Sequence, residues 1–272
     1  MPVWPQRVLM LGCGNMGGAM LAGWLRGGVP AERFTVVDHR LSAAPAGVTL
    51  LREVPAAGDF DAILIGVKPQ ALDDVVPVLA PLVGAGTCLF SILAGVECAS
   101  LAARFPQAGE IVRIMPNLAV AIGQSPMGLY GISAGGALGE VAKARVDALL
   151  APLGTAEWLA DEDLIHAVTA LAGSGPAFVY RFIDALAAAG EGLGLAPDQA
   201  ERLALAMVEG AGALAAAADA GPAELARRVA SPGGTTQKGL DVLDADGALA
   251  GLIARTLTAA RDRSREMAAA AR

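Results

Sequence analysis

Short apolar runs alternate with longer helical segments through the first 160 residues of the chain. The apolar runs have the length of buried strands and span residues 7–11, 34–38, 62–67, 88–92 and 110–115. From Met16 to Leu25 the apolar positions instead repeat with the period of a helix. Residues 125–160 add a strand-like segment, a helix at 138–150 and a last strand. Strands that alternate with helices predict parallel β–α–β units joined by right-handed crossovers.

The pattern changes near Asp161, beyond which strand-like alternation is nearly absent. Helical segments occupy residues 167–171, 178–193, 197–218, 223–229, 235–243 and 248–270. The sequence therefore predicts an α/β domain at residues 1–160, followed by an all-helical domain at residues 161–272.

Several of the later helices are apolar on nearly every face. No charged residue occurs between Glu209 and Asp219, and a helix without a polar face is a buried helix. Charged residues make up only 17% of the chain, against about 25% in an average globular protein. We therefore expect the helical domain to bury these faces against a second copy of the chain. The alternative is a compact, alanine-rich monomer.

Composition and charge limit the partners and the compartment. The formal net charge of −7 comes without a cluster of Lys or Arg, so no nucleic-acid partner is expected. The three cysteines, Cys13, Cys88 and Cys98, indicate reduced thiols. The two histidines lie far apart in the sequence, so no metal site is expected. Without a signal peptide or a long apolar segment, we expect a cytoplasmic protein with no membrane partner.

The strongest motif of the first half is GCGNMG at residues 12–17, which joins the first strand to the first helix. In a dinucleotide-binding fold Gly12 allows a tight turn, Gly14 lets the backbone approach the pyrophosphate, and Gly17 allows close packing. The helix N-terminus would face the negative charge of that group. The alternative is a glycine-rich turn without a ligand, but the strand–turn–helix context favours an N-terminal Rossmann-type domain.

The end of the second strand bears on the choice of cofactor. Asp38 stands about 20 positions after Gly17, where a carboxylate binds the adenosine ribose hydroxyls of NAD. Arg40 is the kind of residue that holds the 2′-phosphate of NADP, and its alternative is a solvated surface residue. NADPH and NADH therefore both stay open as cofactors.

Three further strand ends carry small or polar residues, in the segments GVKPQ (66–70), SILAGV (91–96) and RIMPNLAV (113–120). Ligands of an open parallel sheet bind outside the carboxyl ends of its strands. We therefore expect one rim close to the nicotinamide, made of Lys68, Ala94, Gly95 and Asn117. Taken alone, Lys68 would be an ordinary surface lysine.

Two glycine motifs interrupt the helical half. GSGP at residues 173–176 breaks a helical region, and Pro176 suits the first turn of the next helix. SPGGTT at residues 231–236 leaves the amides of its glycines bare at the start of a helix, with the hydroxyls of Thr235 and Thr236 beside them. Such a helix start binds carboxylates. The alternative is a structural turn capped by threonine.

With these motifs in this order, the chain resembles the pyrroline-5-carboxylate reductase family over essentially its whole length. The resemblance rests on GCGNMG, GVKPQ, LAGV, RIMPN, GSGPAF and, above all, SPGGTT. It implies a Rossmann-type domain followed by an all-α domain that interlocks with another subunit, as a dimer or a pentamer of dimers. It also implies the last step of proline biosynthesis, in which the ring C=N of 1-pyrroline-5-carboxylate is reduced to L-proline with NADPH or NADH.

The resemblance also implies roles for individual residues. The cofactor would contact Leu11, Gly12, Cys13, Gly14, Asn15, Met16, Gly17, Val67, Lys68 and Pro69. Glu162 would lie near the substrate cleft, and the substrate would be held by Ser231, Gly233, Gly234, Thr235 and Thr236. Thr236 would be the hydrogen-bond partner of the ring nitrogen. Two departures stand out: the family's MPNTPA reads MPNLAV at residues 115–120, and Asp38 replaces a small or basic residue.

In the implied reaction the side chains mainly position the substrate, because a protonated cyclic imine already accepts a hydride. Thr236 would then orient the ring nitrogen, since a hydroxyl does not release its proton near neutral pH. Two alternatives remain. One is another reductase of the same two-domain plan, such as an imine reductase or a β-hydroxyacid dehydrogenase, against which SPGGTT argues. The other is a dinucleotide-binding regulator without turnover, which would not need a substrate cradle.

Overall fold

The computed structural model describes residues 5–270, apart from the side chain of residue 270, and these residues form two compact units. The first unit contains the chain up to Gly173 and again from Ala260 onward, and the second contains Ser174–Ala259. Packing therefore divides the chain after Gly173 and returns the end of the last helix to the first unit. The functional division predicted between residues 160 and 161 stays a prediction.

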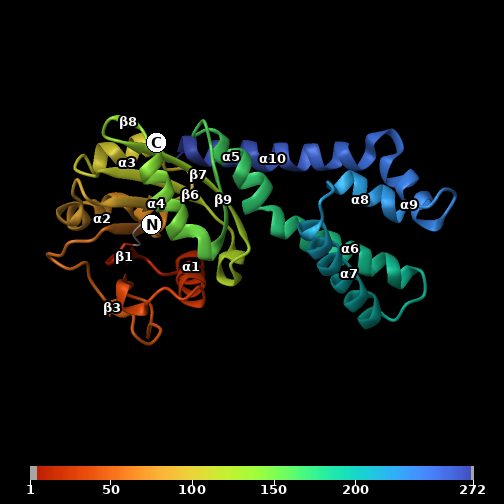
Figure 1. Ribbon diagram of the computed structural model, residues 1–272, viewed down its shortest axis with the longest axis horizontal. Coiled ribbons are helices and arrows are strands. Elements are labelled where there is room, and N and C mark those ends of the chain that lie inside the picture. Colours follow the sequence, from red (N-terminus) through yellow and green to blue (C-terminus); the bar gives the residue numbers. More distant parts are fainter. Residues whose placement is uncertain (1–4, 271–272) are drawn as a thin grey trace. The chain divides into compact units, whose positions relative to one another are not determined.

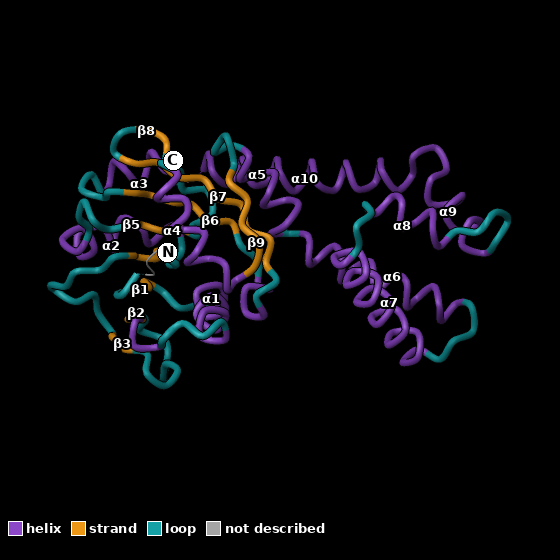
Figure 2. Tube along the Cα trace, in the orientation of Figure 1, coloured by secondary structure: helices purple, strands orange, loops and turns teal. Residues whose placement is uncertain are grey.

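The first unit is built on a sheet that is nine-stranded within the described residues (Figures 1 and 2). Its strands are β1 (Val8–Leu11), β2 (Phe34–Val37), β3 (Thr49–Leu51), β4 (Ala62–Ile65), β5 (Cys88–Ser91), β6 (Glu110–Met115), β7 (Ser125–Ser133), β8 (Gly136–Ala137) and β9 (Gly154–Trp158). The order is β3-β2-β1-β4-β5-β6-β7-β8, with β9 beside β7. Neighbouring strands from β3 to β6 are parallel, and β7 runs antiparallel to β6. The predicted strands are confirmed; β3 and β8 were missed because their apolar runs are too short.

Both faces of the sheet are covered by helices, which explains why the central strands are apolar runs rather than alternating ones. Val8 and Met10 of β1 join a core with α1 (Asn15–Arg26) and α4 (Glu140–Leu150). Leu9 and Leu11 point the other way, into a core with α2 (Leu72–Leu79) and α3 (Cys98–Arg104). The period of two along one strand therefore feeds two separate apolar layers.

The strand order contains one reversal. The chain leaves β1 for β2 and β3 on one side and then returns to β4 on the other side of β1. Sheets of this kind bind ligands at this switch point, outside the carboxyl ends of the strands. GCGNMG follows β1 and the segment at residues 66–70 follows β4, so both motifs lie at the switch point.

The second unit consists of helices (Figure 2). They are α6 (Gly175–Gly192), α7 (Pro197–Ala217), α8 (Pro222–Val229), α9 (Thr235–Asp244) and the first part of α10 (Ala248–Ala270). These helices confirm the predicted ones, and Pro176 lies in the first turn of α6 as expected. The helical segment predicted at residues 167–171 is confirmed, but it begins earlier as α5 (Leu164–Val168) and continues as a π-helical turn, Thr169–Gly173.

The second unit leaves most of its apolar side chains uncovered. Among its residues, all of which the structure describes, only Ala200 and Ala204 are buried hydrophobic residues. Large apolar side chains are exposed on both helices of the α6–α7 pair, among them Tyr180, Phe182, Leu203, Met207 and Leu214. The sequence pattern of a buried helix is thus not satisfied inside one chain. Within the described residues, no helix is long and apolar enough to cross a membrane.

Candidate cofactor and substrate sites

The three glycines of GCGNMG have different surroundings. Gly12 has a φ of 87°, and a Cβ there would lie 2.9 Å from the carbonyl oxygen of Gly66. A Cβ on Gly17 would lie 2.7 Å from the carbonyl oxygen of Gly12. A Cβ on Gly14, in contrast, would meet no atom within 4 Å. The fold itself requires the outer two glycines, whereas the middle one keeps open space at the start of α1, as a dinucleotide pyrophosphate needs.

Asp38 is bound to the same glycine loop. Its Oδ2 accepts a hydrogen bond from the Cys13 N–H (2.9 Å), and its Oδ1 accepts from the N–H groups of Arg40 (2.8 Å) and Leu41 (3.3 Å). Partial burial alone would raise the pKa of Asp38, but the three N–H groups together lower it below its ordinary value. A carboxylate has about four acceptor positions, so Asp38 braces the loop with three of them and has one left; its predicted contact with the ribose stays a prediction. The Arg40 side chain is exposed.

The residues predicted to form a rim follow the carboxyl ends of β4, β5 and β6, and their place beside the nicotinamide stays a prediction. Lys68 and Ala94 are exposed, and Gly95 adopts a φ of 78°. Asn117 differs from these residues because it is buried. Its Oδ1 accepts from the Ala119 N–H (2.9 Å), and its Nδ2 donates to the carbonyl oxygen of Ala172 (3.0 Å).

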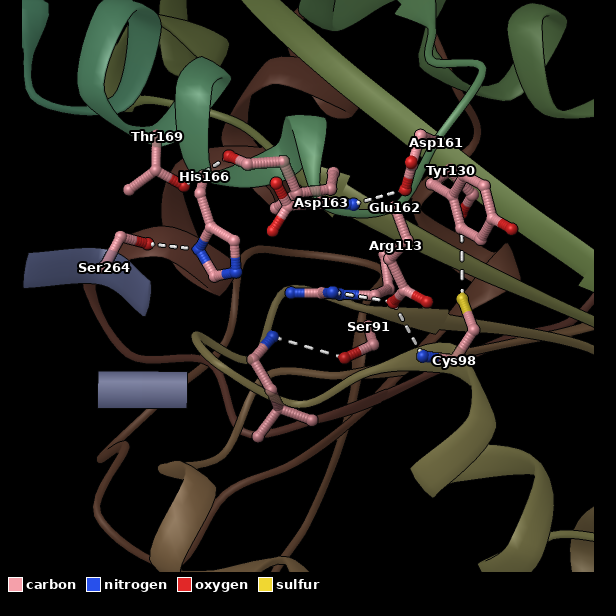
Figure 3. Close-up of polar contacts among 12 residues, drawn as sticks. Ser91, Cys98, Arg113, Tyr130, Asp161, Glu162, Asp163, His166, Thr169 and Ser264 are labelled. Atoms are coloured by element: carbon pink, nitrogen blue, oxygen red, sulfur yellow. Dashed lines mark hydrogen bonds and ion pairs between the residues drawn. The ribbon is translucent and has the colours of Figure 1, made fainter. Parts of the chain in front are cut away.

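A charged cluster lies where β6, the start of α5 and the end of α10 meet within the first unit (Figure 3). Arg113 Nη1 is 2.6 Å from Glu162 Oε1, and the same oxygen accepts from the Cys98 N–H at 2.7 Å. The side chains are 5% and 20% exposed, respectively. Glu162 thus serves internal partners beside a cavity of about 460 Å³, and its predicted place near the substrate cleft stays a prediction.

Sequence reasoning did not single out Arg113, although an arginine inside an otherwise apolar strand was a usable signal. His166 was also passed over; its Nδ1 lies 2.8 Å from Ser264 Oγ and so joins α5 to α10. Burial lowers the pKa of His166, so the ring is neutral near pH 7. Spacing along the chain shows neither contact, because residues of distant segments make them.

The cysteines are unsuited to nucleophilic catalysis. Burial, followed by the charge of Asp38, raises the pKa of Cys13 to about 11. Burial, followed by the charge of Glu162, raises the pKa of Cys98 to about 12. All three cysteines are free thiols. Since the thiolate is the reactive form, these side chains stay inert at neutral pH.

The SPGGTT segment in the second unit forms the start of α9. Gly234 is the N-cap residue, Gly233 before it has a φ of 72°, and no side chain caps the helix. A Cβ on Gly234 would lie 2.4 Å from Ser231 Oγ and 3.1 Å from the Ser231 carbonyl oxygen, so a larger residue would make this serine hydroxyl rotate. Because no side chain caps this helix start, the threonine-capped alternative is wrong. Thr235 and Thr236 are exposed, and their hydroxyls and the first amides of α9 are available to a ligand.

Comparison with known proteins decides the family. A model described as pyrroline-5-carboxylate reductase dimerisation matches residues 162–267, and one described as NADP oxidoreductase, coenzyme F420-dependent, matches residues 7–95. The pyrroline-5-carboxylate reductase of Pseudomonas aeruginosa is 37% identical, covering 96% of this chain and 97% of the relative. The chain belongs to the pyrroline-5-carboxylate reductase family. It is therefore an NAD(P)H-dependent oxidoreductase with the predicted fold class, Rossmann-type followed by helical.

Other members of the pyrroline-5-carboxylate reductase family agree in sequence and in fold. The Aquifex aeolicus protein is 37% identical over 89% of this chain and 90% of its own length. The solved structure of the Coxiella burnetii enzyme superposes with a TM-score of 0.88 at 28% identity, covering 96% of this chain and 98% of that one. The Plasmodium falciparum structure, described as having NADP bound, shares the fold with a TM-score of 0.78 at 23% identity, over 96% of this chain and 98% of that one.

Proposed function

We propose that this chain reduces 1-pyrroline-5-carboxylate to L-proline with NADPH or NADH. The proposal depends mainly on the 37% sequence identity to the Pseudomonas aeruginosa reductase, which extends over 96% of this chain. The open space at Gly14 and the uncapped start of α9 support it, because the reaction needs a dinucleotide site and a carboxylate site. Residues 1–160 would bind the cofactor, and residues 161–272 would hold the substrate and the second subunit.

The cofactor would be held at the switch point of the first unit. Leu11–Gly17 would surround the pyrophosphate, Asp38 and Arg40 the adenosine ribose, and Val67, Lys68, Pro69, Ala94 and Gly95 the nicotinamide end. When bound, NAD(P)H supplies the hydride. The protein's part is to orient the two reactants and exclude water, which is worth several kcal/mol of barrier without any acid or base.

The substrate would be held by Glu162 and by the SPGGTT segment. The bare amides at Gly233 and Gly234 suit its carboxylate, and the hydroxyl of Thr236 suits the ring nitrogen. In the reaction the imine carbon gains a hydride and the C=N π electrons become the lone pair of the ring nitrogen, which already carries its proton. Thr236 thus orients the nitrogen and does not have to supply a proton.

A cofactor-oxidation assay tests this function. Loss of NADPH or NADH absorbance should require 1-pyrroline-5-carboxylate and should not occur with 2-oxo acids. Turnover of the oxo acids alone would identify a different reductase of this two-domain plan. Cofactor binding without any turnover would identify a regulator. The ratio of kcat/KM for the two cofactors gives the preference between them in the same experiment.

The role of Thr236 is tested by a matched pair of substitutions. Thr236→Ala should lower kcat/KM by about 10- to 150-fold, since one hydrogen bond to a charged group is worth roughly 1.5–3 kcal/mol. Thr236→Ser retains the hydroxyl and should keep most of the activity. Equal losses in both variants, or none in either, would contradict an orienting hydroxyl.

We also propose that the working protein is a cytoplasmic homo-oligomer assembled through the second unit. The exposed apolar side chains of α6 and α7 support a second copy as the partner, as does the match to a dimerisation family model over residues 162–267. A dimer or a pentamer of dimers would satisfy these faces. Sedimentation velocity at low concentration should show species heavier than the 27.3 kDa chain; a monomer alone would refute assembly.

A further inference from the structure

Asn117 joins three segments at the carboxyl end of β6. It is 6% exposed. Its N–H donates to Ser125 Oγ (3.0 Å) at the start of β7, and its Oδ1 caps the short 3-10 helix Leu118–Ile122 through the Ala119 N–H. Its Nδ2 donates to the carbonyl oxygen of Ala172 (3.0 Å), which lies 55 residues further along the chain.

Ala172 belongs to the π-helical turn Thr169–Gly173. π-helical turns are rare and frequently occur at functional sites. The turn lies close to β6, since a Cβ on Gly173 would lie 2.5 Å from Cε of Met115, the flexible end of that side chain. A Cβ on Gly128 would likewise lie 2.8 Å from Val168 Cγ1, just before the turn. The turn is therefore held by contacts on β6 and β7 and by one side-chain amide.

We propose that Asn117 is a positioning residue for hydride transfer, rather than a ligand of the cofactor. It ties the rim of the nicotinamide site to the π turn that ends at Gly173, from which the helical unit starts. This proposal rests on the proposed function. A hydride transfer is sensitive to placement, because a displacement of about 1 Å far from the chemistry can cost about 100-fold in rate.

The hydrogen bonds of Asn117 argue against direct contact between its side chain and the cofactor. One of the two amide hydrogens and the carbonyl oxygen are engaged with the backbone, and the residue is only 6% exposed, so little of the side chain can reach a cofactor. Lys68 and Ala94 of the same rim are exposed. A buried amide bonded at both ends fixes the backbone segments that it joins, which matches a positioning role.

Asn117→Asp separates the two roles. Aspartate keeps the oxygen that accepts from Ala119 but loses the donor to Ala172 and places an anionic oxygen against that carbonyl. We expect kcat for 1-pyrroline-5-carboxylate reduction to fall by about tenfold or more. The Kd values for NADPH and NADH, measured by fluorescence without substrate, should stay within about threefold. A tenfold rise in either Kd with kcat retained, or no change in any constant, overturns the proposal.

Gly128→Ala places a Cβ 2.8 Å from Cγ1 and 3.1 Å from Cβ of Val168, a branched side chain just before the turn, and leaves Asn117 intact. It should show the same split between kcat and Kd, and it carries the test alone if Asn117→Asp does not fold. Ile122→Ala changes an exposed side chain of the adjacent 3-10 helix and is the matched control, with all constants unchanged. An inactive wild-type chain would overturn the proposed function, whereas an active wild type with unaltered Asn117→Asp kinetics overturns only the positioning role.

Discussion

The two units bury their apolar side chains in different ways. In the first unit, both faces of the sheet are covered by helices of the same chain, and residues such as Leu9 and Met10 are fully buried. In the second unit, only Ala200 and Ala204 are buried hydrophobic residues, while Leu203 and Leu214 are exposed. The first unit therefore has its own core, whereas the second exposes an apolar surface, which we propose a second copy covers.

The charged contacts differ in the same way. Arg113 and Glu162 are 49 residues apart and form a mostly buried pair. The ion pairs of the second unit, such as Arg202 with Asp198, are exposed and three or four residues apart on one helix. Buried pairs depend on tertiary structure, whereas pairs along a helix depend only on its period.

The largest expected effect is the loss of association on Leu203→Asp. The charge falls on an exposed apolar position of α7, so the single chain can fold, but a second copy would have to desolvate the carboxylate. Sedimentation should shift to the 27.3 kDa monomer. The matched control is Val141→Asp, at an exposed apolar residue of α4 in the first unit, which should leave the assembly unchanged. Equal dissociation of both variants would contradict an interface confined to the second unit.

The next effect compares ion pairs in the two units. Glu162→Gln leaves the buried Arg113 charge without its partner and should lower the free energy of unfolding by about 3 kcal/mol. Glu224→Gln breaks the local pairs with Arg227 and Arg228 and should cost less than about 1 kcal/mol. Urea denaturation measures both. Similar costs would show that the Arg113 pair is no more protected from water than the surface pairs.

Two glycine-to-alanine substitutions in GCGNMG should have different effects, one on the affinity for the cofactor and the other on the stability of the fold. Gly14→Ala places a methyl group in open space, so the Tm should change little, while the Kd for NADPH rises by about tenfold or more. Gly17→Ala forces a Cβ against the Gly12 carbonyl and should cost about 2 kcal/mol of stability. Thermal unfolding and cofactor titration give both quantities. A Gly14→Ala chain with wild-type affinity would contradict a pyrophosphate at this loop.

The smallest expected effect concerns His166 and pH. Burial holds its pKa in the folded chain below the usual 6.5. As the pH falls below 6.5, the unfolded chain takes up a proton that the folded chain does not, so stability is lost down to the folded pKa and then levels off. His166→Asn removes this proton uptake and should flatten the decline of Tm over that window. His39→Asn, at an exposed histidine, should retain the wild-type slope.

Much of the fold could be predicted because its signals are local. The β1 strand, the GCGNMG turn and α1 follow from an apolar run, glycine spacing and a helical period. The short strands β3 and β8 could not be found, because two or three residues do not establish a pattern. The π turn was predicted as ordinary helix, since the Asn117 amide that holds it comes from a distant segment.

The candidate sites likewise combine features that the sequence predicts with features that depend on contacts between distant segments. The sequence by itself determined the family, the order of the motifs and which glycines to expect at a ligand site, because those choices depend on residue type and spacing. Only the tertiary structure decided that Gly14 is open while Gly17 is tightly packed, that Glu162 is paired with Arg113, and that Asn117 binds Ala172. These outcomes depend on which distant backbone segments come within a few ångströms of one another. Spacing along the chain carries no information on such distances.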